Sequence, residues 1–300
     1  TTRLRHATLL FTLAASFTWT TMQAQTWNWV QYGGDANDDR TWSVAGDANG
    51  NVLATGYFYG TLILGDDTLV APGTFQNPDI WLAMFDPAGA PVWARRFGGD
   101  EHDTGQKILL LPNGDIYLMG QFGGTVQLGD TVIYAPDSIG PICGGFVARL
   151  DPNGEPIRAQ VFSLASHSMN GGDMAVDPFG NVHVLAGFDT DGSLNIEVQK
   201  WDPDGQLIWQ APLPAQIDNA RLALTPDGHV LVVGGTTVVG SWLREFDANG
   251  QLVLLKEYPT TLAGALKLND VASDAQGRPI ITGMLINSFV VEGSSHSSAG

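Results

Sequence analysis

The sequence has few basic residues, a single cysteine and no long apolar run after its first two dozen residues. There are 14 Lys and Arg against 31 Asp and Glu, which gives a formal net charge of −17. Nucleic acids and anionic membranes both favour a basic surface, so neither is expected as the natural partner. The lone Cys143 excludes an intramolecular disulfide and a zinc site built from cysteine alone. No later stretch approaches the ~18 apolar residues of a membrane-spanning helix, so no membrane insertion is expected.

The usual short catalytic motifs are also absent. The sequence contains no Gly-x-Ser-x-Gly, no phosphate-binding loop, no His-Glu-x-x-His and no dinucleotide fingerprint. Its six histidines lack the spacing of metal ligands, and His183 and His229 are expected to be structural or surface residues. These absences predict no catalytic residue and no metal centre.

Glycine and apolar residues are plentiful. The chain has 37 glycines in 300 residues, 44% hydrophobic residues and only 15% charged residues. Such a chain is too apolar to be disordered, and its glycine content is typical of a β protein with many turns.

The first 24 residues have the three parts of a secretory signal peptide. Two arginines precede an apolar segment at 7–19, and small and polar residues follow up to a cleavage site after Ala24. We therefore expect the protein to be secreted or displayed on the cell surface after residues 1–24 are removed.

One four-residue pattern recurs nine times along the chain. Seven copies begin with Asp, six have Pro second, and all nine end in Gly. Asp accepts hydrogen bonds from the turn backbone, Pro presets φ, and Gly tolerates the positive φ that lets the next strand start. The pattern predicts tight turns at 47–50, 86–89, 111–114, 151–154, 177–180, 202–205, 225–228, 247–250 and 274–277.

The turns fall into two alternating sets whose glycines recur every 45 to 66 residues. Each repeat therefore holds two hairpins, which is the size of a four-stranded propeller blade. The segment after each first-set turn is almost wholly apolar, as in Val230–Gly234, which predicts a strand buried on both faces. The third strand, as in Ile196–Trp201, alternates with polar residues, which predicts a more solvated position.

The predicted fold class is therefore all-β, a β-propeller of four-stranded antiparallel blades over residues 25–300. The units run at about 27–91, 92–156, 157–207, 208–252 and 253–300. The fifth is expected to be incomplete, with 287–293 in its third-strand region and 294–300 as a polar loop. Propellers close with about four to eight blades, so we expect this chain to be part of a larger propeller. The alternative is closure by Trp27–Tyr32, which precedes the first unit where an outermost strand of a last blade would come from.

The first two units share further motifs that resemble a known repeat family. Both carry an aromatic-Gly-Gly-Asp motif, at Tyr32–Asp35 and Phe97–Asp100, and both continue with a Gly-Thr segment after the second strand. With the Asp-x-x-Gly turns, this order resembles the SBBP-type β-propeller repeats of secreted Bacteroidetes proteins. The resemblance covers about 27–283 and weakens from the third unit. It implies an exported propeller, a possible type IX secretion cargo, with no shared catalytic residues.

One column of residues deviates from the apolar strand pattern. It lies seven residues before each first-set glycine, at the entry to the innermost strand, where a propeller opens onto its central channel. Mixed charges at this mouth predict either a ring of self-satisfied ion pairs or a polar ligand site. The candidate ligand-binding residues are Ser43, Lys107, Asp173, Arg221 and Asp270.

Three acidic segments leave Ca²⁺ as a weakly supported cofactor. Residues 189–197 resemble part of a calcium-binding loop, but they lack most of its ligands and are better explained as a turn. The acidic loops at 35–39 and 100–103 are repeat-equivalent and are expected to be solvated. We expect no other cofactor.

Two functions are compatible with the sequence. The favoured one is a non-catalytic extracellular module for binding, adhesion or structure, with an unknown glycan or protein as its ligand. The alternative is a propeller hydrolase or lyase acting on glycans, which needs two carboxylates about 5–10 Å apart. Asp173 and Asp270 are the only acids of the column, and Arg221 between them would lower both pKa values. The nine tryptophans suggest a quinoprotein as a third hypothesis, but most of them fall on predicted strands, where they are expected to pack between blades.

Overall fold

The computed structural model describes residues 28–34, 38–72, 77–135, 144–163, 172–190, 193–214, 219–236, 240–260, 264–291 and 294–297. These residues form 23 β-strands and contain no helix. Accordingly, none of the described segments is a helix that could cross a membrane. The structure confirms the all-β class and the antiparallel four-stranded sheets.

Five sheets follow one another along the chain, and we call them units 1 to 5. Unit 1 contains β1 (Arg40–Gly46), β2 (Val52–Phe58), β5 (Asp79–Phe85) and β6 (Pro91–Phe97). Unit 2 contains β7 (Thr104–Leu110), β8 (Ile116–Phe122), β11 (Gly144–Leu150) and β12 (Pro156–Ser163). Each carries a hairpin between its second and third strands, formed by β3 (Thr61–Leu64) and β4 (Asp67–Val70) or by β9 (Thr125–Leu128) and β10 (Thr131–Tyr134).

The later units have no such hairpin in the described part of the chain. Unit 3 contains β13 (Met174–Val176), β14 (Val182–Thr190), β15 (Ser193–Trp201) and β16 (Leu207–Pro212). Unit 4 contains β17 (Asn219–Leu224), β18 (Val230–Thr236), β19 (Gly240–Phe246) and β20 (Leu252–Tyr258). Unit 5 contains β21 (Gly264–Ser273), β22 (Pro279–Val291) and β23 (Ser294–Ser297).

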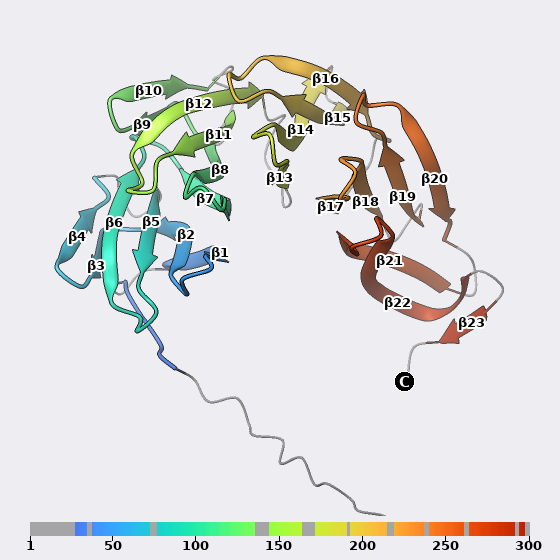
Figure 1. Cartoon of the computed structure of the whole chain (residues 1–300), viewed down its shortest axis with the longest axis horizontal. Helices are drawn as coiled ribbons and strands as arrows, with labels where there is room; N and C mark the ends of the chain where they lie inside the picture. Colours follow the sequence, from blue (N-terminus) through green and yellow to red (C-terminus); the bar gives the residue numbers. More distant parts are fainter. Residues whose placement is uncertain are drawn as a thin grey trace, which may run out of the picture.

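The five units stand side by side in an arc that is open between units 1 and 5 (Figure 1). The first strand of each unit lies on the concave side of the arc, and the fourth strand lies on the convex side. Neighbouring units pack face to face. One apolar core spans units 1 and 2, and a second spans units 2 to 4. A third lies between units 4 and 5.

All nine predicted turns are present and share one geometry. Each closing glycine has a positive φ, between 70° and 88°, and donates its N–H to the first residue of the turn. In seven of the turns that residue is Asp, and its side chain also caps turn backbone, as when Asp151 Oδ1 accepts the N–H groups of Asn153 and Glu155. The sequence pattern identified these turns because their chemistry is local.

The third strands are more buried than predicted. Every residue of β5 is buried, and so are six of the seven in β11. Polar alternation belongs instead to the fourth strands, as in β6. The expectation failed because the third strand lies inside the sheet, where both of its faces are covered. In β11 both faces contact neighbouring units, whereas in β5 one face contacts unit 2 and the other packs against the β3–β4 hairpin and Trp29.

Two segments differ from the sequence-based assignment. Residues 287–291 continue β22 rather than forming a third strand, and 294–297 form β23 rather than a loop. Residues 189–197 lie largely in the β14–β15 hairpin, where Asp189 pairs with Leu194. Backbone pairing explains that segment better than calcium binding. The sheets also end later than the predicted units. The strand after each second turn is the fourth strand of the same sheet, whereas the predicted boundaries place it at the start of the next unit.

Candidate functional site

The predicted column lies on the concave side of the arc, which we call the rim, but mostly not at the strand entries where it was expected. Only Asp173 comes just before its strand, whereas the other four lie inside the first strands of their units: Ser43 in β1, Lys107 in β7, Arg221 in β17 and Asp270 in β21. In three units a β-bulge comes directly before the column residue, between Thr41 and Ser43 in β1, between Gly105 and Lys107 in β7, and between Leu268 and Asp270 in β21. A bulge re-aims the side chain that follows it. No sequence signal announced these bulges.

Three members of the column contact neighbouring units. Ser43 Oγ of unit 1 accepts the N–H of Ile108 in unit 2 at 3.2 Å. Lys107 Nζ of unit 2 forms an ion pair with the Asp173 carboxylate at the start of unit 3. Asp173 is 2% exposed, and its Oδ2 accepts the N–H of Leu222 in unit 4 at 2.8 Å. These contacts link four successive units along the rim.

The other two members are less enclosed. Arg221 is half-buried, and its Nη1 donates to the carbonyl of Ala220 at 2.9 Å. Asp270 is exposed, and its Oδ1 accepts the N–H of Val271 at 2.9 Å. The ligand-binding role of all five residues therefore stays a prediction, since the contacts of Ser43, Lys107 and Asp173 are those of a structural joint.

A second group of charges lies buried where unit 1 meets unit 2. Asp79 and Asp103 are both 0% exposed, and each has one carboxylate oxygen without a hydrogen-bond partner. Arg96 forms an ion pair with Asp79, and Gly99 donates its N–H to Asp103 Oδ2 at 2.7 Å. Burial raises the pKa of Asp79 to about 6, although Arg96 opposes the rise, and burial raises the pKa of Asp103 to about 8.

The expectation that the 100–103 loop is solvated is therefore wrong for Asp103. The same expectation fits the acidic loop of the first unit better, because Asp38 is exposed and pairs with Arg40. Asp39 Oδ1 accepts the N–H of Tyr59 at 2.9 Å, so this carboxylate holds the loop after β2. Residues 35–37 lie outside the described part of the chain. Among the residues that are described, no group of three or more His, Cys, Asp or Glu side chains could hold a metal ion.

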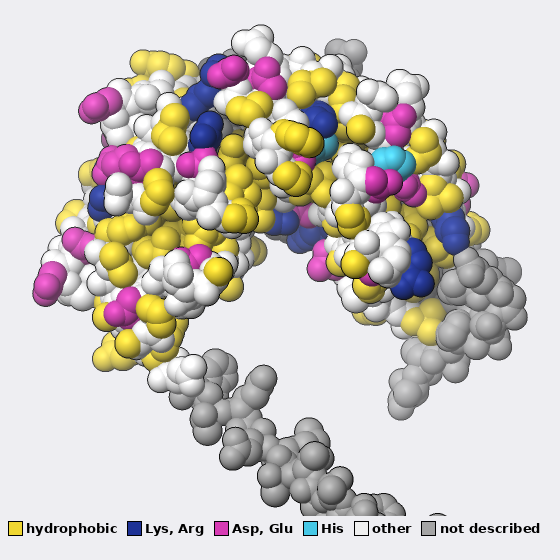
Figure 2. Space-filling model, viewed as in Figure 1, with side chains coloured by type: hydrophobic (Ala, Val, Ile, Leu, Met, Phe, Trp, Pro, Cys, Tyr) yellow, Lys and Arg dark blue, Asp and Glu magenta, His cyan; other side chains and the backbone are white. Residues whose placement is uncertain are grey.

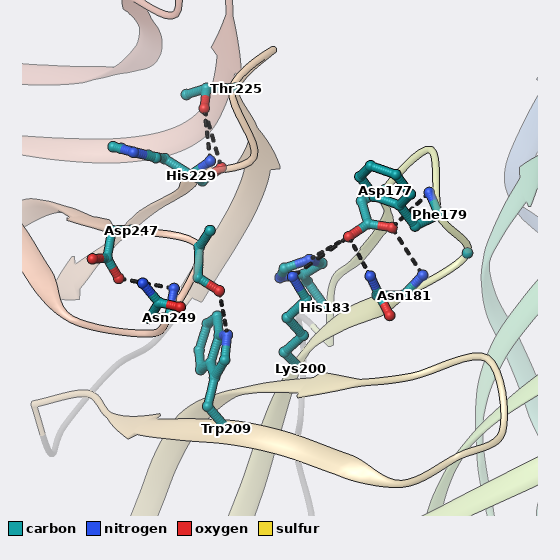
Figure 3. Close-up of polar contacts among 12 residues, drawn as sticks. Asp177, Phe179, Asn181, His183, Lys200, Trp209, Thr225, His229, Asp247 and Asn249 are labelled. Carbon is teal, nitrogen blue, oxygen red and sulfur yellow. Dashed lines mark hydrogen bonds and ion pairs between the residues drawn. The ribbon is translucent and has the colours of Figure 1, made fainter.

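His183 is fully buried in unit 3 beside Asp177, Lys200 and Trp209 (Figure 3). Its Nε2 lies 3.7 Å from Asp177 Oδ2, too far for a hydrogen bond, and neither ring nitrogen has a partner. Burial lowers the pKa of His183 to about 4. Asp177 itself holds its turn by accepting the backbone N–H groups of Phe179 and Asn181. His183 and its three neighbours therefore form a packed cluster rather than a catalytic group.

Replacing His183 by Leu should stabilise the protein. The equivalent position, three residues after the turn glycine, holds Leu53 in unit 1 and Leu231 in unit 4. Removing a buried, unpartnered imidazole should raise the unfolding free energy by about 1–3 kcal/mol at pH 5. The His183 contribution to wild-type stability should be lost as pH falls from 6.5 towards 4, because the unfolded state then binds a proton that the folded state does not. This contribution opposes the one expected from Asp79 and Asp103, and the variant should lack it. Urea unfolding at pH 5 and pH 7 measures both effects, and an unchanged pH dependence in His183→Leu would contradict the assignment.

Comparisons with known proteins add little to this description. No protein-family model and no curated protein matches the chain. A protein of unknown function from Bacteroides caccae has a similar structure, with 13% identity, 82% of each chain covered and a TM-score of 0.45. A proposed exo-β-1,3-galactanase from Bifidobacterium bifidum is 13% identical, with 86% of this chain and 90% of that chain covered and a TM-score of 0.36. At these scores neither similarity carries functional information.

Proposed function

We propose that the chain is a non-catalytic β-propeller module that acts outside the cell in binding, adhesion or structure, after residues 1–24 are removed. The observation that carries this proposal is the way the rim charges are used. The Asp173 carboxylate binds Lys107 and two backbone N–H groups, those of Met174 and Leu222, so it is engaged in the joint between units. A general acid or nucleophile needs a carboxylate that faces the substrate.

The proposed fold is a propeller closed by further strands of the same kind. Trp29 packs over Gly89 of unit 1, as Trp93 of unit 1 packs over Gly154 of unit 2 and Trp209 of unit 3 over Gly250 of unit 4. Residues 28–34 thus stand where the fourth strand of a preceding blade would stand. The β1–β2 face beside them has a hollow of about 200 Å³, and Val44 on it is 66% exposed. A blade packed on this face would fill the hollow and cover Val44.

The secreted location and the resemblance to SBBP-type repeats belong to the same proposal. The signal-like segment at 1–24 supports export, and the acidic composition supports a soluble extracellular module. A glycan hydrolase or lyase remains the alternative. Asp79 and Asp103, whose pKa values are raised, do not favour it, because both are fully buried.

The experiment is to incubate the secreted protein with a panel of soluble polysaccharides and to measure both binding and cleavage. We expect retardation of the protein in gels containing a bound glycan, without release of reducing ends. Release of reducing ends would overturn the proposal. Any such activity should then be compared in Asp173→Asn, whose activity we expect to be unchanged because Asp173 serves the joint between units.

A further inference from the structure

The junction between units 2 and 3 differs from its neighbours in the residue that covers the turn glycine. At the junctions described above, a tryptophan lies over the glycine of the next unit's second turn; Trp93 and Trp209 come from the fourth strands β6 and β16, and Trp29 from the segment before β1. In unit 2 the equivalent residue is Arg158, four residues after Gly154 as Trp93 is four residues after Gly89. A Cβ on Gly205 would stand 2.9 Å from Arg158 Nε, so the guanidinium takes the place of the indole.

This replacement puts two like charges directly opposite each other. Arg158 on β12 pairs in register with Arg149 on β11. Like charges at directly opposed positions destabilise a sheet. Arg149 is neutralised by Asp115, with Nη2 2.7 Å from Oδ2, but no described acidic side chain forms an ion pair with Arg158. An exposed arginine opposite a half-buried one is unexpected in a chain with 14 basic and 31 acidic residues, and Figure 2 shows basic side chains gathered over β11 and β12.

A cleft opens beside the two arginines. Its volume is about 40 Å³, enough for two or three water-sized groups since each needs about 10–15 Å³. Arg149, Arg158 and Gln160 supply its polar lining, and Tyr117 and Trp201 are among its apolar walls. Asp202 also lines the cleft, but its Oδ1 accepts the N–H of Gln206 at 2.7 Å.

A larger hollow adjoins the cleft. It measures about 570 Å³ and shares Tyr117, Arg149 and Pro203 with the cleft. Asp115, which pairs with Arg149, and Asp177, which holds its own turn, also line the hollow. Phe179 lines it and is 83% exposed, at a turn position that holds Asn in four other turns. An exposed aromatic ring beside hydrogen-bonding side chains offers a flat apolar surface next to polar groups.

We propose that the cleft and hollow between units 2 and 3 bind an acidic saccharide, with a carboxylate or sulfate held by Arg149 and Arg158 and a sugar ring against Phe179. This inference rests on the proposed binding function and names its ligand class. An oxyanion supplies the Arg158 guanidinium with the acidic partner that Arg149 already has in Asp115, through charge-assisted hydrogen bonds. A saccharide suits the site better than a peptide, because sheet faces and turns line it, and extended peptides commonly bind by adding to a strand edge.

The test uses trigalacturonate as the probe and its fully methyl-esterified form as the neutral control. We expect isothermal titration to show binding of the acid form, weakened by raised salt, and little binding of the ester. Arg158→Trp restores the residue found at the neighbouring junctions and fills the cleft. It should fold normally and bind trigalacturonate about tenfold or more weakly, since hydrogen bonds to charged groups carry that much affinity. Arg158→Gln provides a second variant if the tryptophan disturbs the junction.

Arg278→Gln is the matched control, because Arg278 is an exposed arginine of unit 5 with its side chain 74% accessible. It should bind trigalacturonate like the wild type. Unchanged binding in both Arg158 variants, equal binding of tetraglutamate, or no binding of trigalacturonate by the wild type would each overturn the acidic-saccharide site. None of these results would overturn the general binding function. Release of reducing ends from a polysaccharide would overturn that function and leave the arginine site to be judged by the titrations.

Discussion

Replacement of Asp173 by Ala should cost about 2–4 kcal/mol of unfolding free energy, because it breaks a partly buried ion pair and removes two hydrogen-bond acceptors at once. The carboxylate is almost fully enclosed, bound to Lys107 and to the N–H groups of Met174 and Leu222. Its loss leaves those donors without partners at the joint of units 2, 3 and 4. Urea unfolding followed by tryptophan fluorescence measures the change.

Ser43→Ala is the matched control at the same column. It removes one neutral hydrogen bond to Ile108 and should cost about 1 kcal/mol. If Asp173 served mainly a ligand, its replacement would leave stability unchanged or raised, since binding groups are often kept at the expense of stability. A loss no larger than that of Ser43→Ala would therefore contradict the structural role.

The second large effect concerns pH. Asp79 and Asp103 keep their protons in the folded state up to about pH 6 and pH 8, whereas unfolded carboxyls ionise near pH 4. Between those values the folded state binds more protons, so stability falls as pH rises. Each group contributes a slope of up to about 1.4 kcal/mol per pH unit in its window.

Asp103→Asn should remove the part of this slope that lies between pH 6 and pH 8, because Asn has no proton to lose. Its amide oxygen can still accept the N–H of Gly99. Thermal unfolding from pH 5 to pH 8.5 provides the measurement. Asp130→Asn, at an exposed turn of the same unit, should leave the slope as it is in the wild type. Equal slopes in all three proteins would show that Asp103 ionises normally.

Some features of the protein follow from sequence alone because the forces behind them are local. The nine turns were predicted in place, since Asp, Pro and Gly each fix one element of a turn within four residues. The apolar second strands, such as β8, are buried as expected, because a continuous apolar run is stable only between two covered faces. The repeat period predicted the four-stranded sheet, because each repeat holds two local hairpins.

Other features were decided only when distant segments met. The polar alternation of the third strands suggested solvent, yet β5 is buried because unit 2 covers one face and the β3–β4 hairpin with Trp29 covers the other. Asp103 sits in an acidic loop but is enclosed at the junction of two units, and Asp173 is held by a lysine 66 residues away. The facing pair of Arg149 and Arg158 depends on the register of two strands, and their cleft depends on the turn of the following unit. Local patterns thus determined turns, strands and repeats, whereas charge burial and pairing between units were set by tertiary packing, because both depend on which surfaces come together.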